Sequence, residues 1–298
     1  MNPDGKCSCR GFSDALAEIA EEGSGVIFPK RREGAAMQDV MLRAAGLALG
    51  GKRVFVSSEF DPIFIARCYE QIRTSIAIPN LKVALSSIHD GPALDREGAA
   101  MQMNEDFALM RLLPGMVVLS PSDSRSAYVL THSLASLPEG PAYMRLSNAA
   151  SGDIYGPEDS DFGIGSARLL SEGDGVTICA TGVMVSEALA AKDALLSQGI
   201  CADVIDCYSI KPFPERTLLA SVRRTGCCVV AEKHAAAGGL FSAAAECICR
   251  EYPVPVRSVS VEDRFGQSGT GEELREYYGL THREIVHNVL QVWAIRRR

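Results

Sequence analysis

A chain of 298 residues is long enough for one large or two medium domains, each with a hydrophobic core of its own. Hydrophobic residues make up 47% of the chain and charged residues 22%, a balance that excludes an intrinsically disordered protein. The formal net charge of −7 argues against nucleic-acid binding, which normally requires a basic patch. The dense basic runs at 30–32 and 296–298 are interpreted as solvated or interface residues.

The ten cysteines form no metal-binding or disulfide pattern. Closely spaced cysteines occur at Cys7 and Cys9, Cys227 and Cys228, and Cys247 and Cys249. None of these pairs has a complementary C-x-x-C pair or nearby histidines, so we expect reduced, mostly buried thiols of a cytoplasmic protein. The first residues contain no apolar stretch of signal-peptide length, and no segment approaches the ~20 apolar residues that span a bilayer.

The first half of the chain alternates short β-rich runs with longer stretches of helical periodicity. The expected strands are Val26–Phe28, Arg53–Ser57, Lys82–Ser86, Met116–Leu119 and Ala142–Leu146. The expected helices are Ala36–Leu49, Pro62–Ile76, Asn104–Leu112 and Ser124–Leu137. Strands that alternate with helices of this length predict a mostly parallel sheet with helices on both faces.

Residues 147–163 are rich in Gly, Ser, Pro and Asp without a period, which predicts an interdomain linker. The alternation then resumes. The expected strands are Val176–Ala180, Ala202–Asp206, Cys228–Ala231 and Arg257–Val261. The expected helices are Met184–Gln198, Pro214–Arg224, Leu240–Arg250, Glu272–Tyr278 and Arg283–Ile295. The sequence therefore predicts two doubly wound α/β domains, at residues 1–155 and 156–298, of which the second is smaller.

Several segments resemble the transketolase family, and they occur in the family's order. They are AAGLALGGKRVFVSS at 44–58, NEDFALMRLLPGMVVLSPSD at 104–123, GPAYMRLS at 140–147, GDGVTICATGVMVSEAL at 173–189, VIDCYSIKPF at 204–213, VVAEKHAAAGGLFSAAAE at 229–246 and DRFGQSGTGEELREYYGLT at 263–281. The resemblance covers about residues 35–290. It implies a thiamine diphosphate-type pyrimidine-binding domain followed by a transketolase C-terminal-like domain.

The diphosphate-binding domain of full-length family members has no counterpart in this sequence. That domain binds Mg²⁺ and diphosphate through a GDG…N motif, whereas the GDG at 173–175 lies in the second expected domain without an Asn at the required spacing. The resemblance therefore implies an N-terminal transketolase-like partner subunit that carries this motif and holds the metal and the diphosphate. An α₂β₂ heterotetramer is expected, because the family's cofactor sites lie between subunits.

The position of the family's catalytic glutamate holds a different residue. The family reads G-x-A-E-Q-N before an AAGLA helix, and this chain reads GAAMQD at 34–39 followed by AAGLA at 44–48. Met37 therefore stands where the glutamate would contact the aminopyrimidine ring. A thioether is a weak acceptor without charge, and the loss of a positioned acid or base costs ~10²–10⁴-fold in rate. The nearest acid, Glu33, is interpreted as a surface charge.

Two loops also differ from the family pattern. An acidic D-x-D-like loop is essentially absent, because only a few residues separate the first expected strand from the glutamate position. In the stretch at 89–102, Glu97 replaces an aspartate that contacts the donor hydroxyl, and Met101 replaces a histidine that handles protons. His89 matches a phosphate contact of the family, although it is also interpreted as a loop hydrogen-bonder. Met101 is interpreted as a packing residue.

Other candidate site residues match the family pattern. Phe60 and Phe64 fall where family aromatics wrap the pyrimidine ring, and they equally fit a role as core aromatics. Arg145 matches a phosphate contact, for which a bidentate guanidinium is suited, with a structural ion pair as the alternative. The sequence predicts cofactor contacts at Met37, Phe60 and Phe64, substrate contacts at His89, Glu97 and Arg145, and no metal ligands in this chain. His234, before a Gly-Gly turn, is interpreted as structural.

Three functions are compatible with these residues. The first is the C-terminal subunit of a split transketolase-like enzyme that transfers a two-carbon ketol or related acyl unit, with an unusual sugar or ketose-derived substrate in specialised metabolism. The second is a catalytically impaired structural or regulatory partner of a thiamine diphosphate enzyme, favoured by Met37 and Met101. The third is a β-type subunit of a ketoacid dehydrogenase, which ranks last because the motifs at 210–213 and 265–269 look more like transketolase.

Overall fold

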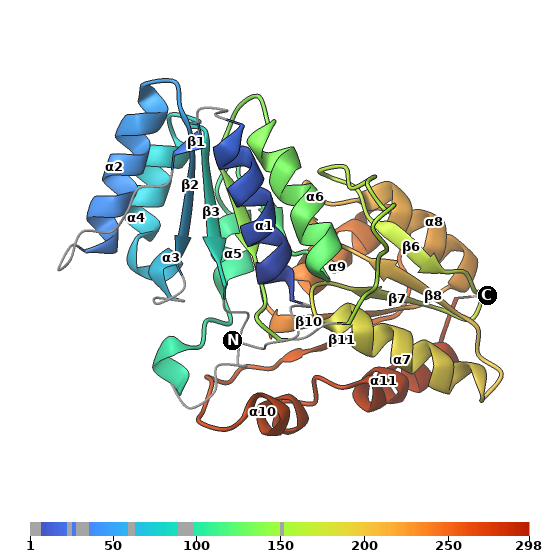
Figure 1. The fold of residues 1–298 in the computed structure, drawn as a ribbon. Helices are drawn as coiled ribbons and strands as arrows, with labels where there is room; N and C mark the ends of the chain where they lie inside the picture. Colours follow the sequence, from blue (N-terminus) through green and yellow to red (C-terminus); the bar gives the residue numbers. More distant parts are fainter. Residues whose placement is uncertain are drawn as a thin grey trace.

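The computed structural model describes residues 7–22, 26–27, 36–58, 63–88, 98–149 and 152–297. They form two α/β units that lie side by side (Figure 1). The strand order of the first sheet is β1 (Val26–Ile27), β2 (Arg53–Ser58), β3 (Val83–Ser87), β5 (Ala142–Arg145), β4 (Val117–Leu119) and β9 (Ser209–Lys211). Its strands are parallel except β9, which pairs antiparallel with β4.

The second sheet has five strands. Their order is β11 (Val256–Val261), β10 (Cys228–Ala235), β7 (Val176–Ala180), β8 (Ala202–Asp206) and β6 (Arg168–Ser171). Only β6 runs antiparallel, at the edge beside β8. Both sheets are thus mostly parallel, as the alternation of strands and helices predicts. Since β9 belongs to the second half of the chain, the two units share a strand as well as a surface.

Helices cover both faces of each sheet (Figure 1). One face of the first sheet carries α1 (Ser8–Glu21) and α6 (Ser124–Ala135), and the other carries α2 (Met37–Leu49), α3 (Phe64–Arg67), α4 (Tyr69–Gln71), a π-helix (Ile72–Ala77) and α5 (Asp106–Arg111). The second sheet lies between α8 (Glu215–Thr225) with α9 (Leu240–Glu251) and α7 (Met184–Leu196) with α10 (Gly271–Tyr277) and α11 (His282–Ala294).

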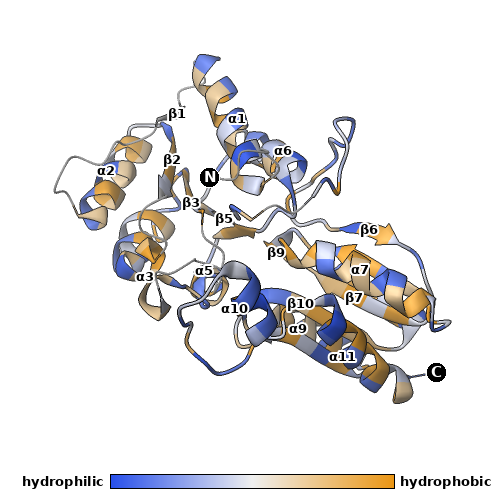
Figure 2. Cartoon of the chain, turned by 60° about the horizontal axis from the view of Figure 1, so that its bottom comes forward, coloured by the Kyte–Doolittle hydropathy of each residue, from blue (hydrophilic) through white to orange (hydrophobic). Residues whose placement is uncertain are grey.

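One hydrophobic core is continuous across both units. It joins side chains of α2 and α3, such as Met41 and Phe64, to side chains of α8 and α9, such as Leu218 and Leu240. Figure 2 shows hydrophobic residues along the strands and the helix faces that flank them, whereas α10 is largely hydrophilic. Because burial of apolar area is the main stabilising contribution, we infer that the two units stabilise each other.

Most expected elements are present within a few residues of their predicted bounds. The helix expected at Pro62–Ile76 is instead α3, α4 and the π-helix in succession. The sequence did not predict α1 or the edge strands β6 and β9. The two strands have four and three residues and lie at the edges of their sheets, where pairing with one neighbour defines them. Phe28, the expected end of the first strand, lies outside the described residues.

The segment expected to be a linker is packed against both units rather than free. Tyr155 and Phe162 are buried with their rings edge to face. The Asp123 carboxylate, which also caps α6, accepts hydrogen bonds from the backbone N–H groups of Ile154 and Tyr155, at 3.1 and 2.9 Å. The polar composition of the segment 147–163 therefore reflects specific hydrogen bonds to the rest of the protein, such as those to Asp123. The predicted domain boundary near residue 155 stays a prediction.

The cysteines require one correction. Cys7 and Cys9 form a disulfide before and within the first turn of α1, where their Cα atoms lie 5.4 Å apart, a separation that permits a bond. The other cysteines are free, and all but Cys201 and Cys249 are buried, as expected. None of the helices in the described ranges combines the length and the apolar character that a membrane span requires.

Asp206, at the end of β8, joins the second sheet to the first. Ser122 and Tyr155 donate hydrogen bonds from their hydroxyls to its Oδ2, at 2.6 and 2.7 Å. Burial raises the pKa of the Asp206 carboxyl to about 7, although these two hydrogen bonds lower it. Asp123 and Arg168 also face this group, with opposite effects on the pKa. The folded protein therefore holds a proton here that the unfolded chain releases near pH 3.8.

We expect the Asp206→Asn substitution to become more stabilising as the pH rises. The folded pKa is raised, so the wild-type contribution is complete below the unfolded pKa and is lost as the pH approaches 7. Relative to the wild type, the free energy of unfolding of the variant should gain up to ~1.4 kcal/mol per pH unit between about pH 4 and pH 7. Urea titrations at several pH values measure this difference, with the exposed Asp193→Asn as control. A difference independent of pH would contradict it.

Candidate functional site

The candidate site lies at the carboxyl edge of the first sheet, the edge at which mostly parallel α/β sheets bind their ligands. Three residues of the predicted set, Phe60, His89 and Glu97, lie outside the described residues, as does Glu33. The described members are Met37, Phe64, Met101 and Arg145, which come from α2, α3, the short 3₁₀ helix at Ala99–Met101 and β5.

Met37 is the first residue of α2, and its side chain is buried in the hydrophobic core. The preceding Ala36 is extended and provides no side-chain cap, so this helix start has no polar side chain at its first two positions. The acidic residue of the first turn is Asp39, which is exposed. In the described part of this helix start, the buried position therefore holds a neutral thioether and the carboxylate faces outward.

Phe64 begins α3 and is fully buried in the same core as Met37. Its enclosure fits the role of a core aromatic, and its contact with a cofactor ring stays a prediction. Met101 is half-buried at the end of the 3₁₀ helix. The next residue, Gln102, is buried and donates a hydrogen bond from Nε2 to the Gln267 carbonyl, at 2.9 Å. The segment that follows the predicted substrate loop is thus tied to the C-terminal unit.

Arg145 lies at the carboxyl end of β5 with only 4% of its surface exposed. Its Nε donates to Asp106 Oδ2 at 2.8 Å, and its Nη2 forms a second contact with Asp106 Oδ1. Its Nη1 donates to the Lys233 carbonyl at 2.7 Å, and the guanidinium lies 4.2 Å from the centre of the Phe107 ring. Tyr143 donates to the same carboxylate at 2.5 Å. The geometry is that of a structural ion pair, and a substrate contact by Arg145 stays a prediction.

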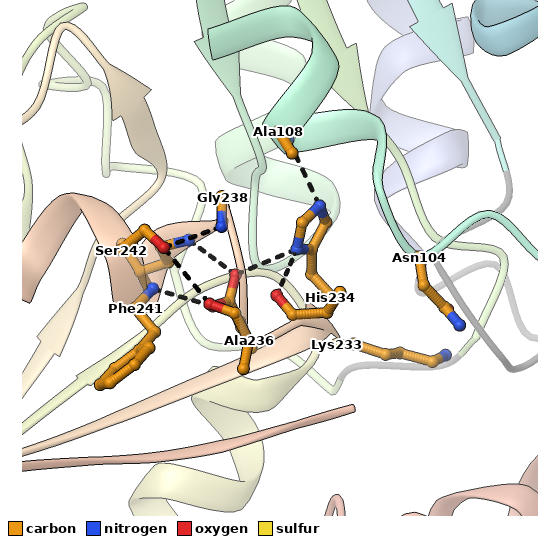
Figure 3. A network of polar contacts seen from close by, with 12 residues as sticks. Asn104, Ala108, Lys233, His234, Ala236, Gly238, Phe241 and Ser242 are labelled. Atoms are coloured by element: carbon orange, nitrogen blue, oxygen red, sulfur yellow. Dashed lines mark hydrogen bonds and ion pairs between the residues drawn. The ribbon is translucent and has the colours of Figure 1, made fainter. Parts of the chain in front are cut away.

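His234 lies beside this ion pair, with Nε2 3.8 Å from Asp106 Oδ1, and it contacts both units. Figure 3 shows its ring facing Ala108 of α5. Its ring stacks on Phe107 with centroids 5.0 Å apart, and Nε2 accepts the Ala108 N–H at 3.4 Å. The acceptor role of Nε2 places the proton on Nδ1, which donates to the Ala235 carbonyl at 2.7 Å. Burial lowers the pKa of His234 to about 4. The imidazole is therefore neutral at pH 7, and both nitrogens make structural contacts.

The Gly-Gly turn after His234 allows an unusually close approach. A Cβ at Gly238, whose φ is +83°, would lie 2.4 Å from the Ala108 Cβ, and a Cβ at Gly239 would lie 2.1 Å from Glu232 Oε2. Glu232 accepts the Leu240 and Phe241 N–H groups at the start of α9. Burial raises the pKa of the Glu232 carboxyl to about 7, while these hydrogen bonds lower it. The turn therefore brings α5 and α9 together around a buried acid.

Sequence reasoning missed Asp106 and Glu232, although both are buried charged residues at this junction. A signal for Asp106 was present: a buried arginine requires a carboxylate partner, and Asp106 precedes Phe107 in the segment that resembles the family. A cavity of about 10 Å³ lies beside the pair, lined by residues such as Ser120, Thr181 and Lys233. This volume holds about one water molecule.

The ion pair gives a direct test of the junction. We expect Asp106→Asn to lower the free energy of unfolding by roughly 3–5 kcal/mol, because it leaves the Arg145 charge buried without its partner. The control is Glu215→Gln, which breaks an exposed pair with Arg250 and should cost no more than ~1 kcal/mol. Denaturant titrations measure both changes. Equal effects of the two variants would contradict the assignment of Arg145 and Asp106 as a stabilising junction.

Comparison with known proteins gives the same two units. The family model of the transketolase pyrimidine-binding domain matches residues 38–152, and that of the transketolase C-terminal domain matches residues 165–285. The 6-deoxy-6-sulfo-D-fructose transketolase subunit SqwH of Clostridium sp. (strain MSTE9) is 40% identical over 264 residues, which cover 87% of this chain and 80% of the relative.

Two further relatives match over nearly their whole length. One subunit of the apulose-4-phosphate transketolase of Phocaeicola vulgatus is 32% identical over 305 residues, covering 95% of this chain and 97% of the relative. A solved structure described as a split gene transketolase, inactive β4 tetramer, superposes with a TM-score of 0.88 at 34% identity, covering 98% of this chain and 99% of that one. The chain therefore belongs to the transketolase family and corresponds to the C-terminal subunit of its split members.

Proposed function

We propose that this chain acts, together with an N-terminal partner subunit, as a transketolase that moves a two-carbon ketol unit from an unusual anionic ketose to an aldehyde. The observation that carries this proposal is the end-to-end match to split transketolase subunits, over 97% and 99% of two relatives. Two relatives are named for a sulfosugar and for a sugar phosphate. Both names describe sugars with a strongly acidic group, which supports the substrate class.

Two cationic residues lie at the small cavity beside the carboxyl edge of the first sheet. Lys233 and Arg145 line the same small cavity, together with Ser120 and Ser147. Asp106 neutralises the charge of Arg145. The cavity holds about one water molecule, so the substrate class rests on the names of the two relatives.

Family membership implies dependence on thiamine diphosphate. In the proposed assembly the partner holds Mg²⁺ and the diphosphate through its GDG…N motif, and this chain contributes the side that faces the pyrimidine ring. The described residues fit this group only in part. Met37 and Phe64 stand at the helix starts where the family's cofactor contacts are expected, but both are buried in the core, and Met37 provides no carboxylate for the ring nitrogen. No proton-transfer step is therefore assigned to the described residues.

Met37 supports a second candidate function, in which the chain is a catalytically impaired partner that stabilises or regulates an assembly. A buried thioether accepts hydrogen bonds weakly and cannot exchange protons. The two candidate functions involve the same fold, the same partner subunit and the same contribution to the cofactor site. They differ only in whether the assembly turns over substrate. Measured turnover therefore separates the two.

The outer face of α2 supports association with another chain. Leu42 and Leu49 are 50% and 71% exposed, one turn to either side of Gly46, and a Cβ at Gly46 would meet no atom within 4 Å. Leucines that flank a glycine form a flat apolar strip, which suits close packing by a second chain. In an α₂β₂ assembly this face would be covered by the partner subunit.

We expect Met37→Glu to raise the turnover of the copurified pair about 10²–10⁴-fold, because a carboxylate restores the acid–base group at the start of α2. Met37→Gln has a similar size without the charge and should give no such increase. Ketol transfer from a ketose phosphate and from a 6-sulfo ketose to an aldehyde is followed with thiamine diphosphate and Mg²⁺ present. Absence of turnover in the wild type and in both variants would contradict the catalytic proposal and favour the second candidate.

A further inference from the structure

Cys7 and Cys9 combine a disulfide partner with access to solvent. They are bonded to each other at the start of α1, and both residues are partly exposed. The eight other cysteines are free, and of these only Cys201 and Cys249 are exposed. The pair at the start of α1 is therefore the place where a small thiol or disulfide in solution can reach two cysteines that bond to each other.

The residue between the two cysteines ties the start of α1 to the end of β5. Ser8 is buried, and its hydroxyl accepts the Ser147 N–H at 2.7 Å and donates to the Ser147 carbonyl at 3.3 Å. The Cys9 N–H donates to the same carbonyl at 3.2 Å. Ser147 follows Arg145 by two residues and lines the same small cavity. The disulfide thus spans the contacts that connect α1 to the segment beside the Arg145 ion pair.

The rest of α1 is held by packing that does not involve the disulfide. A Cβ at Gly11 would lie 1.8 Å from the Ser124 carbonyl oxygen, so the backbones of α1 and α6 touch without a side chain between them. Phe12 is buried, and its ring centroid lies 6.5 Å from that of Phe55. Figure 1 shows α1 lying beside α6. Opening the disulfide therefore affects the first turn of the helix and leaves the remainder docked.

The start of α1 also favours thiol–disulfide exchange. The thiolate is the form that attacks a disulfide, and the partial positive charge at a helix start stabilises it. Cys7 is the N-cap residue, and the first turn of α1 contains no acidic residue that would oppose this effect. The Cα atoms of Cys7 and Cys9 lie 5.4 Å apart, so Cys9 can reach a mixed disulfide formed at Cys7.

We propose that Cys7 and Cys9 form a reversible redox site for low-molecular-weight thiols and disulfides, and that its oxidation orders the first turn of α1 against Ser147. In the oxidising direction, the Cys7 thiolate attacks a small disulfide RSSR and releases one RS⁻. The Cys9 thiolate then attacks the Cys7 sulfur, which forms the Cys7–Cys9 bond and releases the second RS⁻. The two cysteines lose two electrons and two protons, and RSSR becomes two RSH. A small thiol reverses both steps.

Glutathione buffers of varied thiol-to-disulfide ratio test the exchange on the full chain. We expect alkylation followed by mass spectrometry to show Cys7 and Cys9 converting together between a dithiol and an intramolecular disulfide, which is two hydrogens lighter. The exposed Cys201 and Cys249 are internal controls, since a thiol without a bonding partner gains glutathione instead. A glutathione adduct that persists on Cys7 or Cys9, or a disulfide that no ratio reduces, would overturn the inference.

Hydrogen exchange measures the effect on the helix start. We expect amide exchange in residues 8–12 to slow about 10-fold when the disulfide forms, because the bond restricts the open state of this turn. The double variant Cys7→Ser, Cys9→Ser should exchange at the reduced rate in every buffer, and serine keeps a favourable N-cap at position 7. Exchange in α7 should not depend on the buffer. Equal rates for the oxidised and reduced chains in residues 8–12 would contradict the ordering of this turn by oxidation.

Discussion

The buried charge of Arg145 is the constraint on which the junction of the two units depends. A guanidinium with 4% exposure is tolerated only where its hydrogen bonds and its charge are matched. Asp106 matches the charge from α5, and the Lys233 carbonyl accepts a further hydrogen bond from the C-terminal unit. The two halves of the chain must therefore come together before this arginine is satisfied, which couples the strand that carries it to the C-terminal unit.

The contacts around Arg145 explain why the C-terminal unit matters to a site built on the first sheet. His234 stacks on the same Phe107 ring that the guanidinium covers, and the turn at Gly238–Gly239 lets α5 approach α9. A second contact, from Gln102 to the loop after β11, fixes the segment that follows the predicted substrate loop. The C-terminal unit thus orients groups at the carboxyl edge of the first sheet without lying in that sheet, apart from the edge strand β9.

Local periodicity was sufficient to predict the strands and helices that carry the cores, because each has an apolar pattern of its own. It was insufficient for β6 and β9, which are short edge strands defined by pairing with distant partners. The same distinction holds at the site. The sequence indicated Arg145 and the absent carboxylate at Met37, but it did not indicate Asp106 or Glu232 as partners, since their roles depend on contacts between segments that lie far apart in the chain.

The proposed function requires that this chain and its partner complete the cofactor site together. Calorimetric titration of thiamine diphosphate, with Mg²⁺, into this chain alone, into the diphosphate-domain chain alone and into the copurified pair tests it most directly, with light scattering to establish the stoichiometry. We expect binding to the pair, in an assembly of two copies of each chain, and none to this chain alone. Binding that is equally tight to either isolated chain, or a pair that assembles and binds no cofactor, would contradict it.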